Sequence, residues 1–181
     1  MKELFKKYKP VIQFVVLFLG SYLVLSALYA YYLKVSVDSG YPPDYLTNLV
    51  ARQSATLLEA FGYTSALEVN TLREGMLLII DNNYAVNIVE GCNAASVIIL
   101  FVSFIISFAE TFKKTFLFLL AGAVLIYVVN ILRIALLVVA LNKYPEYQDV
   151  LHSVIFPAVI YGMVFILWIV WVRTLNAKPS K

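Results

Sequence analysis

Four long apolar stretches limit the folds open to this chain more than any other feature. They cover residues 11–33, 92–109, 116–141 and 154–172. A helix of roughly 20 apolar residues crosses a hydrocarbon core about 30 Å thick, and each stretch is close to this length. Only 14% of the residues are charged, which is too little polar surface to cover the core of a soluble domain. The sequence therefore predicts an all-α membrane protein with about four transmembrane helices.

The lysines and arginines indicate how these helices are oriented. Short loops rich in these residues stay on the cytoplasmic side of a membrane. The basic segments are "MKELFKKYK" at the start, the turn "ETFKK" and the tail "RTLNAKPSK". Both termini are therefore predicted to be cytoplasmic, with residues 34–91 and 142–153 outside. The first apolar stretch is too long for a signal peptide and is interpreted as a retained anchor. No basic stripe suggests a nucleic-acid partner.

The largest segment outside the apolar stretches is 34–91, interpreted as an extracytoplasmic cap within a single integral membrane domain, 1–181. In it, "YPPDYLTNLVARQSATLLEAFGY" predicts an amphipathic helix at the interface, closed by Gly62. The apolar side of this helix is predicted to contain Leu46, Leu49, Val50, Gln53, Leu57 and Phe61. The runs "GMLLIID" and "YAVNIVEG", with the turn "DNN" between them, predict a β-hairpin that delivers the chain directly into Cys92.

The single cysteine of the chain stands in "VEGCNAAS", at the first turn of the second apolar stretch. The free N–H groups and the positive end of a helix dipole favour a thiolate there, so Cys92 could act as a nucleophile. Taken alone, however, a small apolar residue packed in a membrane helix is the better interpretation. An extracytoplasmic thiol without a disulfide partner weakens that interpretation slightly.

Arg133 lies inside the third apolar stretch, about eight residues and hence roughly 12 Å from its outer end. An arginine in the middle of a span costs about 2.5–3.5 kcal/mol, so it usually faces a protein interior, a water-filled cavity or a partner. Snorkelling to the outer headgroups is the alternative. Asn130 is three residues earlier on the same side of the helix, and two polar residues on one stripe favour a buried polar site.

His152 is the only histidine and opens the fourth apolar stretch. By itself, an interfacial histidine is normally a solvated polar group. With both termini inside, however, Cys92, the outer half of the third span and His152 all face the outer boundary. They would supply a nucleophile, a cationic stabiliser and a proton-transfer group, which an acyl-transfer site needs. One cysteine and one histidine are a poor basis for a zinc site, and we expect no metal or other cofactor.

The segments "EGCNAAS", "NILR" and "LHSVIFP" occur in this order. In order and predicted topology they resemble the exosortase/archaeosortase family of membrane cysteine transpeptidases, and the chain is similar in size to the short exosortase F type. The family pattern is an extracytoplasmic cysteine at the start of a span, N-x-x-R on a later span and histidine at the start of another. One departure is visible: the family often has glycine two residues after the cysteine, where this chain has Ala94.

The resemblance implies substrates that are secreted proteins with a C-terminal sorting signal, made of a short motif, a transmembrane helix and a basic end. It also implies a location in the bacterial cytoplasmic (inner) membrane, with the active site on the extracytoplasmic side. Cys92 would attack the scissile carbonyl to form a thioacyl intermediate, Arg133 would stabilise the oxyanion, and His152 would transfer protons. Asn130 would orient Arg133, and Glu90 and Asn93 would contact the site.

Two other functions are compatible with the same residues. A thiol peptidase would hydrolyse the sorting signal with water as the acceptor and would transfer nothing. A non-catalytic membrane assembly or transport subunit would pair Arg133 with Glu90 and use Cys92 only for packing.

Overall fold

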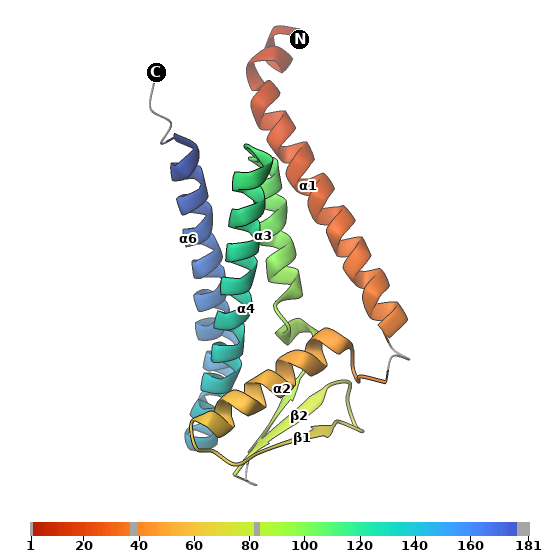
Figure 1. Cartoon of the computed structure of the whole chain (residues 1–181), viewed down its shortest axis with the longest axis vertical. Helices are drawn as coiled ribbons and strands as arrows, with labels where there is room; N and C mark the ends of the chain where they lie inside the picture. The colour runs from red at the N-terminus through yellow and green to blue at the C-terminus, as the bar shows by residue number, and fades with distance from the viewer. Residues whose placement is uncertain (1, 37–39, 82–83, 177–181) are drawn as a thin grey trace.

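The computed structural model describes residues 2–36, 40–81 and 84–176. Most of the described chain is helical (Figure 1). A small sheet lies in the sequence between the first two helices and the remaining ones. The elements, in chain order, are α1 (Lys2–Ser36), α2 (Tyr45–Ala60), β1 (Ser65–Val69), β2 (Met76–Ile80), β3 (Tyr84–Ile88), η1 (Glu90–Cys92), α3 (Ala95–Ser107), α4 (Phe112–Lys143), η2 (Pro145–Tyr147), α5 (Gln148–Val150), η3 (Leu151–Ile155) and α6 (Phe156–Asn176).

The long helices form a bundle in which α3, α4 and α6 pack against one another and α1 packs against α3. Figure 1 shows both termini at one end of this bundle, and α2 and the sheet at the opposite end. α1 leans away from α4 toward the sheet end, and α2 lies across the bundle there (Figure 1). Helix α2 contacts α4 and the sheet, so it connects the sheet to the bundle.

Three helices of the described chain are long and apolar enough to cross a membrane: Tyr8–Ser36, Phe112–Lys143 and Pro145–Leu175. The second predicted span, 92–109, is wrong in its length, because α3 has only 13 residues. At 1.5 Å per residue α3 is about 20 Å long, against about 30 Å for a hydrocarbon core. The reason is local: residues 90–92 form a 3₁₀ turn and Ala94 is left-handed (φ 64°), so the α-helix begins at Ala95.

Helix α2 forms where the sequence predicts an amphipathic helix. Asp44 caps it, since its carboxylate accepts a hydrogen bond from the backbone N–H of Thr47 (3.1 Å). Gly62 follows its end with φ 88°, a conformation that glycine adopts readily. The predicted apolar side is wrong, because Gln53 and Phe61 are exposed. The buried side instead consists of Thr47, Asn48, Val50, Ala51, Ser54, Ala55 and Leu58.

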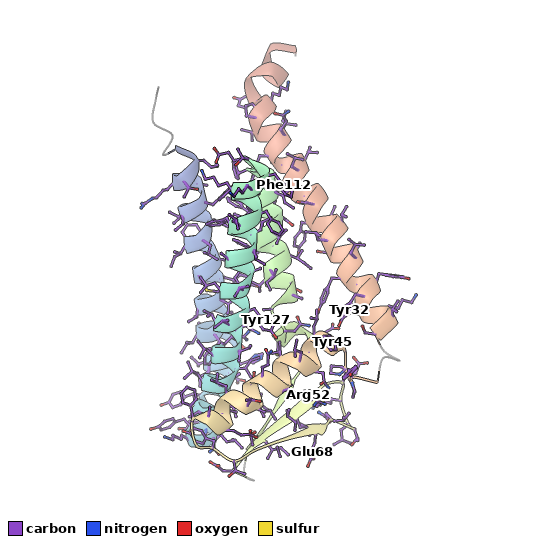
Figure 2. All side chains as sticks on the ribbon, viewed as in Figure 1. Tyr32, Tyr45, Arg52, Glu68, Phe112 and Tyr127 are labelled. Carbon is purple, nitrogen blue, oxygen red and sulfur yellow. The ribbon has the colours of Figure 1, made fainter. Side chains whose placement is uncertain are left out.

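This buried side is turned by one residue, or roughly 100°, from the predicted one. Its many small side chains let α2 lie close to α4 and to the sheet, which a row of leucines would prevent. Gln53 stays outside this contact, where it accepts a hydrogen bond from the hydroxyl of Tyr127 on α4 (2.7 Å). Figure 2 shows Tyr127 beside the end of α2 that carries Tyr45.

The predicted hairpin is present as β2 and β3. The two strands are antiparallel, with Met76 opposite Ile88 at one end and Ile80 opposite Tyr84 at the other. Its predicted turn includes residues 82–83, which lie outside the described residues. A third strand, β1, was not predicted; it pairs with β2 to give the order β1-β2-β3. Alternate residues of β2 are buried in a core cluster shared with α2 and α4. The sheet is therefore fixed to α4, and β3 leads from it into η1.

Candidate active site

Cys92 is the last residue of η1, between strand β3 and helix α3. Its side chain is half-buried and packs against the core cluster that α2, the sheet and α4 share. Its backbone N–H donates to the carbonyl of Val89 (2.8 Å), which closes the turn. The thiol therefore stands at a fixed junction of three structural elements, close to the N-terminus of α3.

Because α3 is short, this junction meets α4 near the middle of that helix and not at its end (Figure 1). The contact is direct: the side-chain amide of Asn130 donates to the backbone carbonyl of Cys92 at 2.6 Å. Asn130 is only 1% exposed, so the bond is sheltered from water and correspondingly strong.

Arg133 extends this contact by one more step. Its guanidinium Nη1 donates to the side-chain oxygen of Asn130 at 3.3 Å. Asn130 thus uses its amide nitrogen on Cys92 and its oxygen on Arg133, as their spacing of three residues on one side of α4 allows. The Nε of Arg133 is buried and makes no hydrogen bond within the described chain. A buried donor without a partner is able to bind an anionic group that enters the site.

Asn93 fixes the backbone on the other side of Cys92. It is 4% exposed, and its amide donates to the hydroxyl of Tyr29 on α1 (2.7 Å) and to that of Thr47 on α2 (3.1 Å). Its side-chain oxygen accepts from the N–H of Ala95 (2.9 Å), at the first residue of α3. One side chain therefore connects the start of α3 to both α1 and α2.

The backbone conformation of Ala94 shows why glycine would suit this position, where the chain departs from the pattern that it resembles. Its φ of 64° places it in the left-handed region, which glycine adopts freely and other residues adopt at about 1–2 kcal/mol. The backbone makes a sharp turn here between Asn93 and α3. Glycine is the residue that suits this turn best, and in this chain alanine accepts the strain.

The side chains of the remaining two predicted site residues form no hydrogen bond with this cluster in the described structure, although the backbone carbonyl of Glu90 accepts from the N–H of Asn93 (3.3 Å). His152 is exposed on the π-helical turn η3, which precedes α6 at the sheet end of the bundle. Glu90 is exposed at the start of η1. In the described parts of the chain, no hydrogen bond or ion pair links either residue to Cys92 or Arg133. The pairing of Arg133 with Glu90, on which the non-catalytic alternative depends, is not found there.

Sequence reasoning missed the tyrosines of α1 that surround the site. Tyr29 holds Asn93, while the hydroxyl of Tyr32 donates to Asp44 (3.2 Å) and accepts from the N–H of Leu46 (3.1 Å). Figure 2 shows Tyr32 on the part of α1 that is nearest to α2. The chain has 13 tyrosines, several of them in the first apolar stretch, and nothing in the sequence distinguishes these two. Only their spacing of three residues, which puts both on one side of a helix, was a usable signal.

Comparisons with known proteins support the resemblance at the level of the family. The sequence matches the family model of the transmembrane exosortases over residues 11–172. The matched range contains Cys92, Asn130, Arg133 and His152. Searches of curated proteins and of solved structures return no match. Since the family match covers nearly the whole chain, from the first membrane helix to the end of the last, this protein belongs to the transmembrane exosortase family.

Proposed function

We propose that this chain is a membrane-embedded cysteine transpeptidase that cleaves C-terminal sorting signals of secreted proteins through a thioacyl intermediate. The observation that carries the proposal is the hydrogen-bonded connection from Cys92 through the buried Asn130 to Arg133. Membership of the exosortase family supports it. The proposed setting is the bacterial cytoplasmic membrane, with both termini in the cytoplasm and residues 34–91 as the extracytoplasmic cap.

The proposed reaction has two halves. The thiolate of Cys92 attacks the scissile carbonyl carbon, and the carbonyl oxygen becomes an oxyanion. The C–N bond then breaks, His152 gives a proton to the leaving amine, and the acyl group remains on Cys92 as a thioester. In the second half, His152 takes a proton from the acceptor, the acceptor attacks the thioester, and the thiolate leaves.

Arg133 could stabilise the oxyanion because one of its hydrogen-bond donors is not used within the described structure. Its Nη1 is used on Asn130, while its Nε is buried without a partner in the described structure. A donor that is fixed and desolvated before the charge develops stabilises the transition state without reorganisation, and losing one such donor typically costs a factor of about 10²–10³. Asn130 is then a positioning residue, since it orients Arg133 and holds the backbone of the nucleophile. We give Asn93 the same role, and Glu90 that of a contact at the edge of the site.

His152 has a role that requires bound substrate. It lies on a different element from Cys92, and no contact joins the two side chains within the described residues. In the proposed mechanism the substrate peptide lies between them, so that its carbonyl faces Cys92 and its leaving nitrogen faces η3. A π-helical turn is a feature often found at functional sites.

The test is the processing of a co-expressed secreted protein that carries a C-terminal sorting signal. Cys92→Ala removes the nucleophile with little change in size, so we expect a folded, membrane-inserted protein that leaves the substrate at full length. Cys92→Ser is expected to be nearly inactive, because a hydroxyl lacks the acidity of the thiol. Normal processing by a well-expressed Cys92→Ala variant would refute covalent catalysis by this residue.

The other two roles are tested in the same assay. Arg133→Lys keeps the charge but loses the planar fork of donors, so a large loss of processing is expected. His152→Ala should block protonation of the leaving amine, while Ser153→Ala, on the same exposed turn, is the matched control and should process normally. Equal processing by the His152 and Ser153 variants would remove His152 from the mechanism. The intact mass of the product separates transfer from hydrolysis, because only transfer adds an acceptor.

A further inference from the structure

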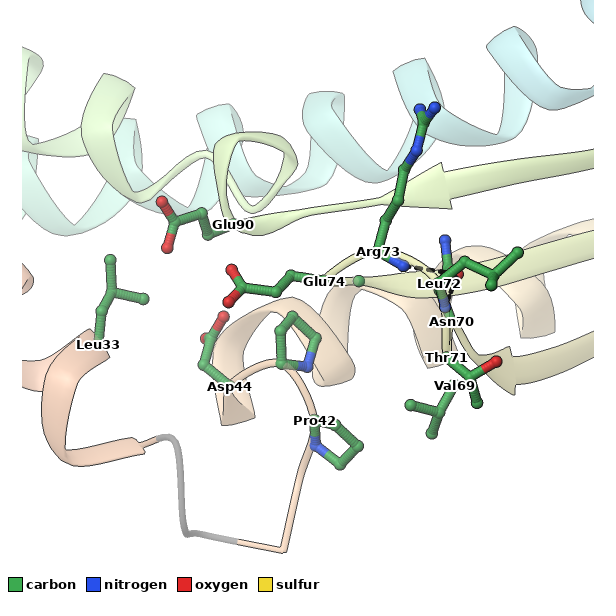
Figure 3. Close-up of a pocket in the computed structure, with 12 residues that line it drawn as sticks. Leu33, Pro42, Asp44, Val69, Asn70, Thr71, Leu72, Arg73, Glu74 and Glu90 are labelled. Carbon is green, nitrogen blue, oxygen red and sulfur yellow. Dashed lines mark hydrogen bonds between the residues drawn. The ribbon is translucent and has the colours of Figure 1, made fainter.

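A cavity of about 440 Å³ lies beside the candidate active site. It is lined by the end of α1, the start of α2, the segment between β1 and β2, and the start of η1, and it is open to solvent. Three of its lining residues are acidic: Asp44, Glu74 and Glu90. In Figure 3 the carboxylate of Asp44 points toward that of Glu74, and the side chain of Glu90 extends in the same direction as that of Glu74; the three residues come from three different segments of the chain.

Asp44 differs from the other two acidic residues of the cavity because its carboxylate is buried and not solvated. It is 1% exposed. Its Oδ1 accepts hydrogen bonds from the N–H of Thr47 (3.1 Å) and from the hydroxyl of Tyr32 (3.2 Å). Its Oδ2 is buried and makes no hydrogen bond in the described structure. A buried carboxylate oxygen without a partner is destabilising, so this oxygen has the properties of half of a binding site whose other half is a ligand.

The charge of the cavity indicates that its ligand is cationic. Arg73 also lines it, but in Figure 3 its side chain points away from the three carboxylates. Within the described residues, no ion pair joins Asp44, Glu74 or Glu90 to a cation. Nor do any three acidic, histidine or cysteine side chains of the described chain lie close enough to hold a metal ion. The cavity volume is in the range of pockets that bind organic groups, which extends from about 300 to 1,000 Å³.

We propose that this acidic cavity binds the ammonium or guanidinium group of a lysine or arginine in the substrate polypeptide, next to the scissile bond. The proposal rests on the proposed function of Cys92. Glu90 and Cys92 are two residues apart in η1, so their Cα atoms are separated by at most about 7 Å. A basic side chain in the cavity would therefore place a nearby peptide bond at the thiol, and would supply the missing partner of Asp44.

The first test requires no substrate and no turnover. Cys92 is the only thiol of the chain, so the full-length protein in detergent is labelled with a cationic aminoethyl and an anionic sulfonatoethyl methanethiosulfonate. Removing the negative charge of Glu90, whose Cα is at most about 7 Å from that of Cys92, should lower the cation-to-anion rate ratio about threefold, even with water-like screening. Asp44→Asn should lower the ratio in the same direction, because asparagine keeps the helix cap but not the charge.

Glu68→Gln is the matched control. Glu68 is exposed on β1 (Figure 2). It is not among the residues that line the cavity, so the rate ratio of Glu68→Gln should equal that of the wild type. Saturable protection of Cys92 from the cationic reagent by N-acetyl-lysine amide, but not by N-acetyl-glutamine amide, would show binding in addition to attraction. Equal ratios in the Glu90, Asp44 and Glu68 variants, or equal protection by both amides, would overturn the proposal whether or not Cys92 is catalytic.

The second test uses processing. Glu90→Gln and Asp44→Asn should raise KM for cleavage several-fold with little change in kcat, and replacing the basic residue nearest the cleavage point by glutamine should raise KM equally in the wild type. Unchanged KM in both variants, while Cys92→Ala is inactive, would overturn the cavity proposal and leave the proposed function intact. Normal cleavage with accumulation of the thioacyl-enzyme would assign the cavity to an acceptor amine and would also overturn it.

Discussion

Replacing Asn130 by leucine tests whether the connection between Cys92 and Arg133 holds the site together. Leucine has nearly the shape of asparagine and suits a membrane helix, so on hydrophobicity alone the substitution should be neutral or stabilising. The structure predicts the opposite. The variant loses the 2.6 Å bond to the carbonyl of Cys92 and the 3.3 Å bond from Arg133.

The size of the loss follows from the burial of the groups that remain. A carbonyl left without a partner in a dry interior costs about 1–3 kcal/mol, and a hydrogen bond to a charged group contributes about 1.5–3 kcal/mol. Arg133 is only half-buried and can turn partly toward water, so we take the lower end of its range. We therefore expect Asn130→Leu to lower the free energy of unfolding by about 2.5–4.5 kcal/mol, a large part of the stability of a typical domain.

Equilibrium unfolding of the purified protein in detergent, followed by circular dichroism, measures this loss. Asn142→Leu is the matched control, because Asn142 is on the same helix and makes no side-chain hydrogen bond within the described chain. Asn130→Asp separates the two contacts: it keeps the acceptor for Arg133 but turns a carboxylate oxygen toward the carbonyl of Cys92. Its free energy of unfolding should be lower than that of the wild type, because that oxygen cannot donate to the carbonyl. Equal stability of Asn130→Leu and Asn142→Leu would refute the reasoning.

Two further predictions concern packing and topology. A Cβ added at Gly122 would lie 2.3 Å from the ring of Phe101, which is fully buried, so Gly122→Ala should lower the free energy of unfolding by about 1–3 kcal/mol. Phe101→Leu in the same chain should recover part of this loss, and Gly162→Ala, with nothing within 4 Å, should cost nothing; equal unfolding energies for both alanine variants would contradict the packing. Reporter fusions after residue 60 and within 143–150 should read as external and a C-terminal fusion as internal, and a cytoplasmic reading at 143–150 would separate His152 from the proposed site.

The membrane helices were predictable because their signal is strong and local. An apolar run long enough to span a bilayer has few alternative structures in a short chain, and the described residues contain three such helices. The length of α3 was not predictable in the same way. Its apolar run is continuous, and the left-handed Ala94 that delays the helix is chemically an ordinary alanine. The buried side of α2 was also misjudged, because Thr47 and Ser54 are small enough to pack closely although they are polar.

The site was partly predictable because polar residues inside an apolar membrane helix cost free energy unless they have a partner. An arginine and an asparagine inside an apolar helix need a partner, and the structure gives them one in each other and in the backbone of Cys92. The residues that hold Asn93 carry no such signal. Tyr29 and Thr47 are individually unremarkable in their helices, and only the packing of α1 and α2 around the start of α3 gives them a common partner.

The short α3 also resolves a mismatch in the sequence prediction. The sequence places Arg133 roughly 12 Å inside its span and Cys92 at the outer boundary, which leaves a difference in depth between two residues that are predicted to share one site. Suppose that the turn before α4 lies at the cytoplasmic boundary. The N-terminus of α3, next to Cys92, then lies about 10 Å short of the opposite boundary, because 13 residues cover only about 20 Å of a core of about 30 Å. Cys92 then lies at the depth of Arg133, as their shared contact with Asn130 requires. In the proposed mechanism, less water would surround the reacting carbonyl at that depth, and the charge of Arg133 would act on the oxyanion with less screening than at the membrane surface. The proposed scissile bond would then have to enter the bundle beneath α2, which a substrate carrying its own transmembrane helix could do from the bilayer.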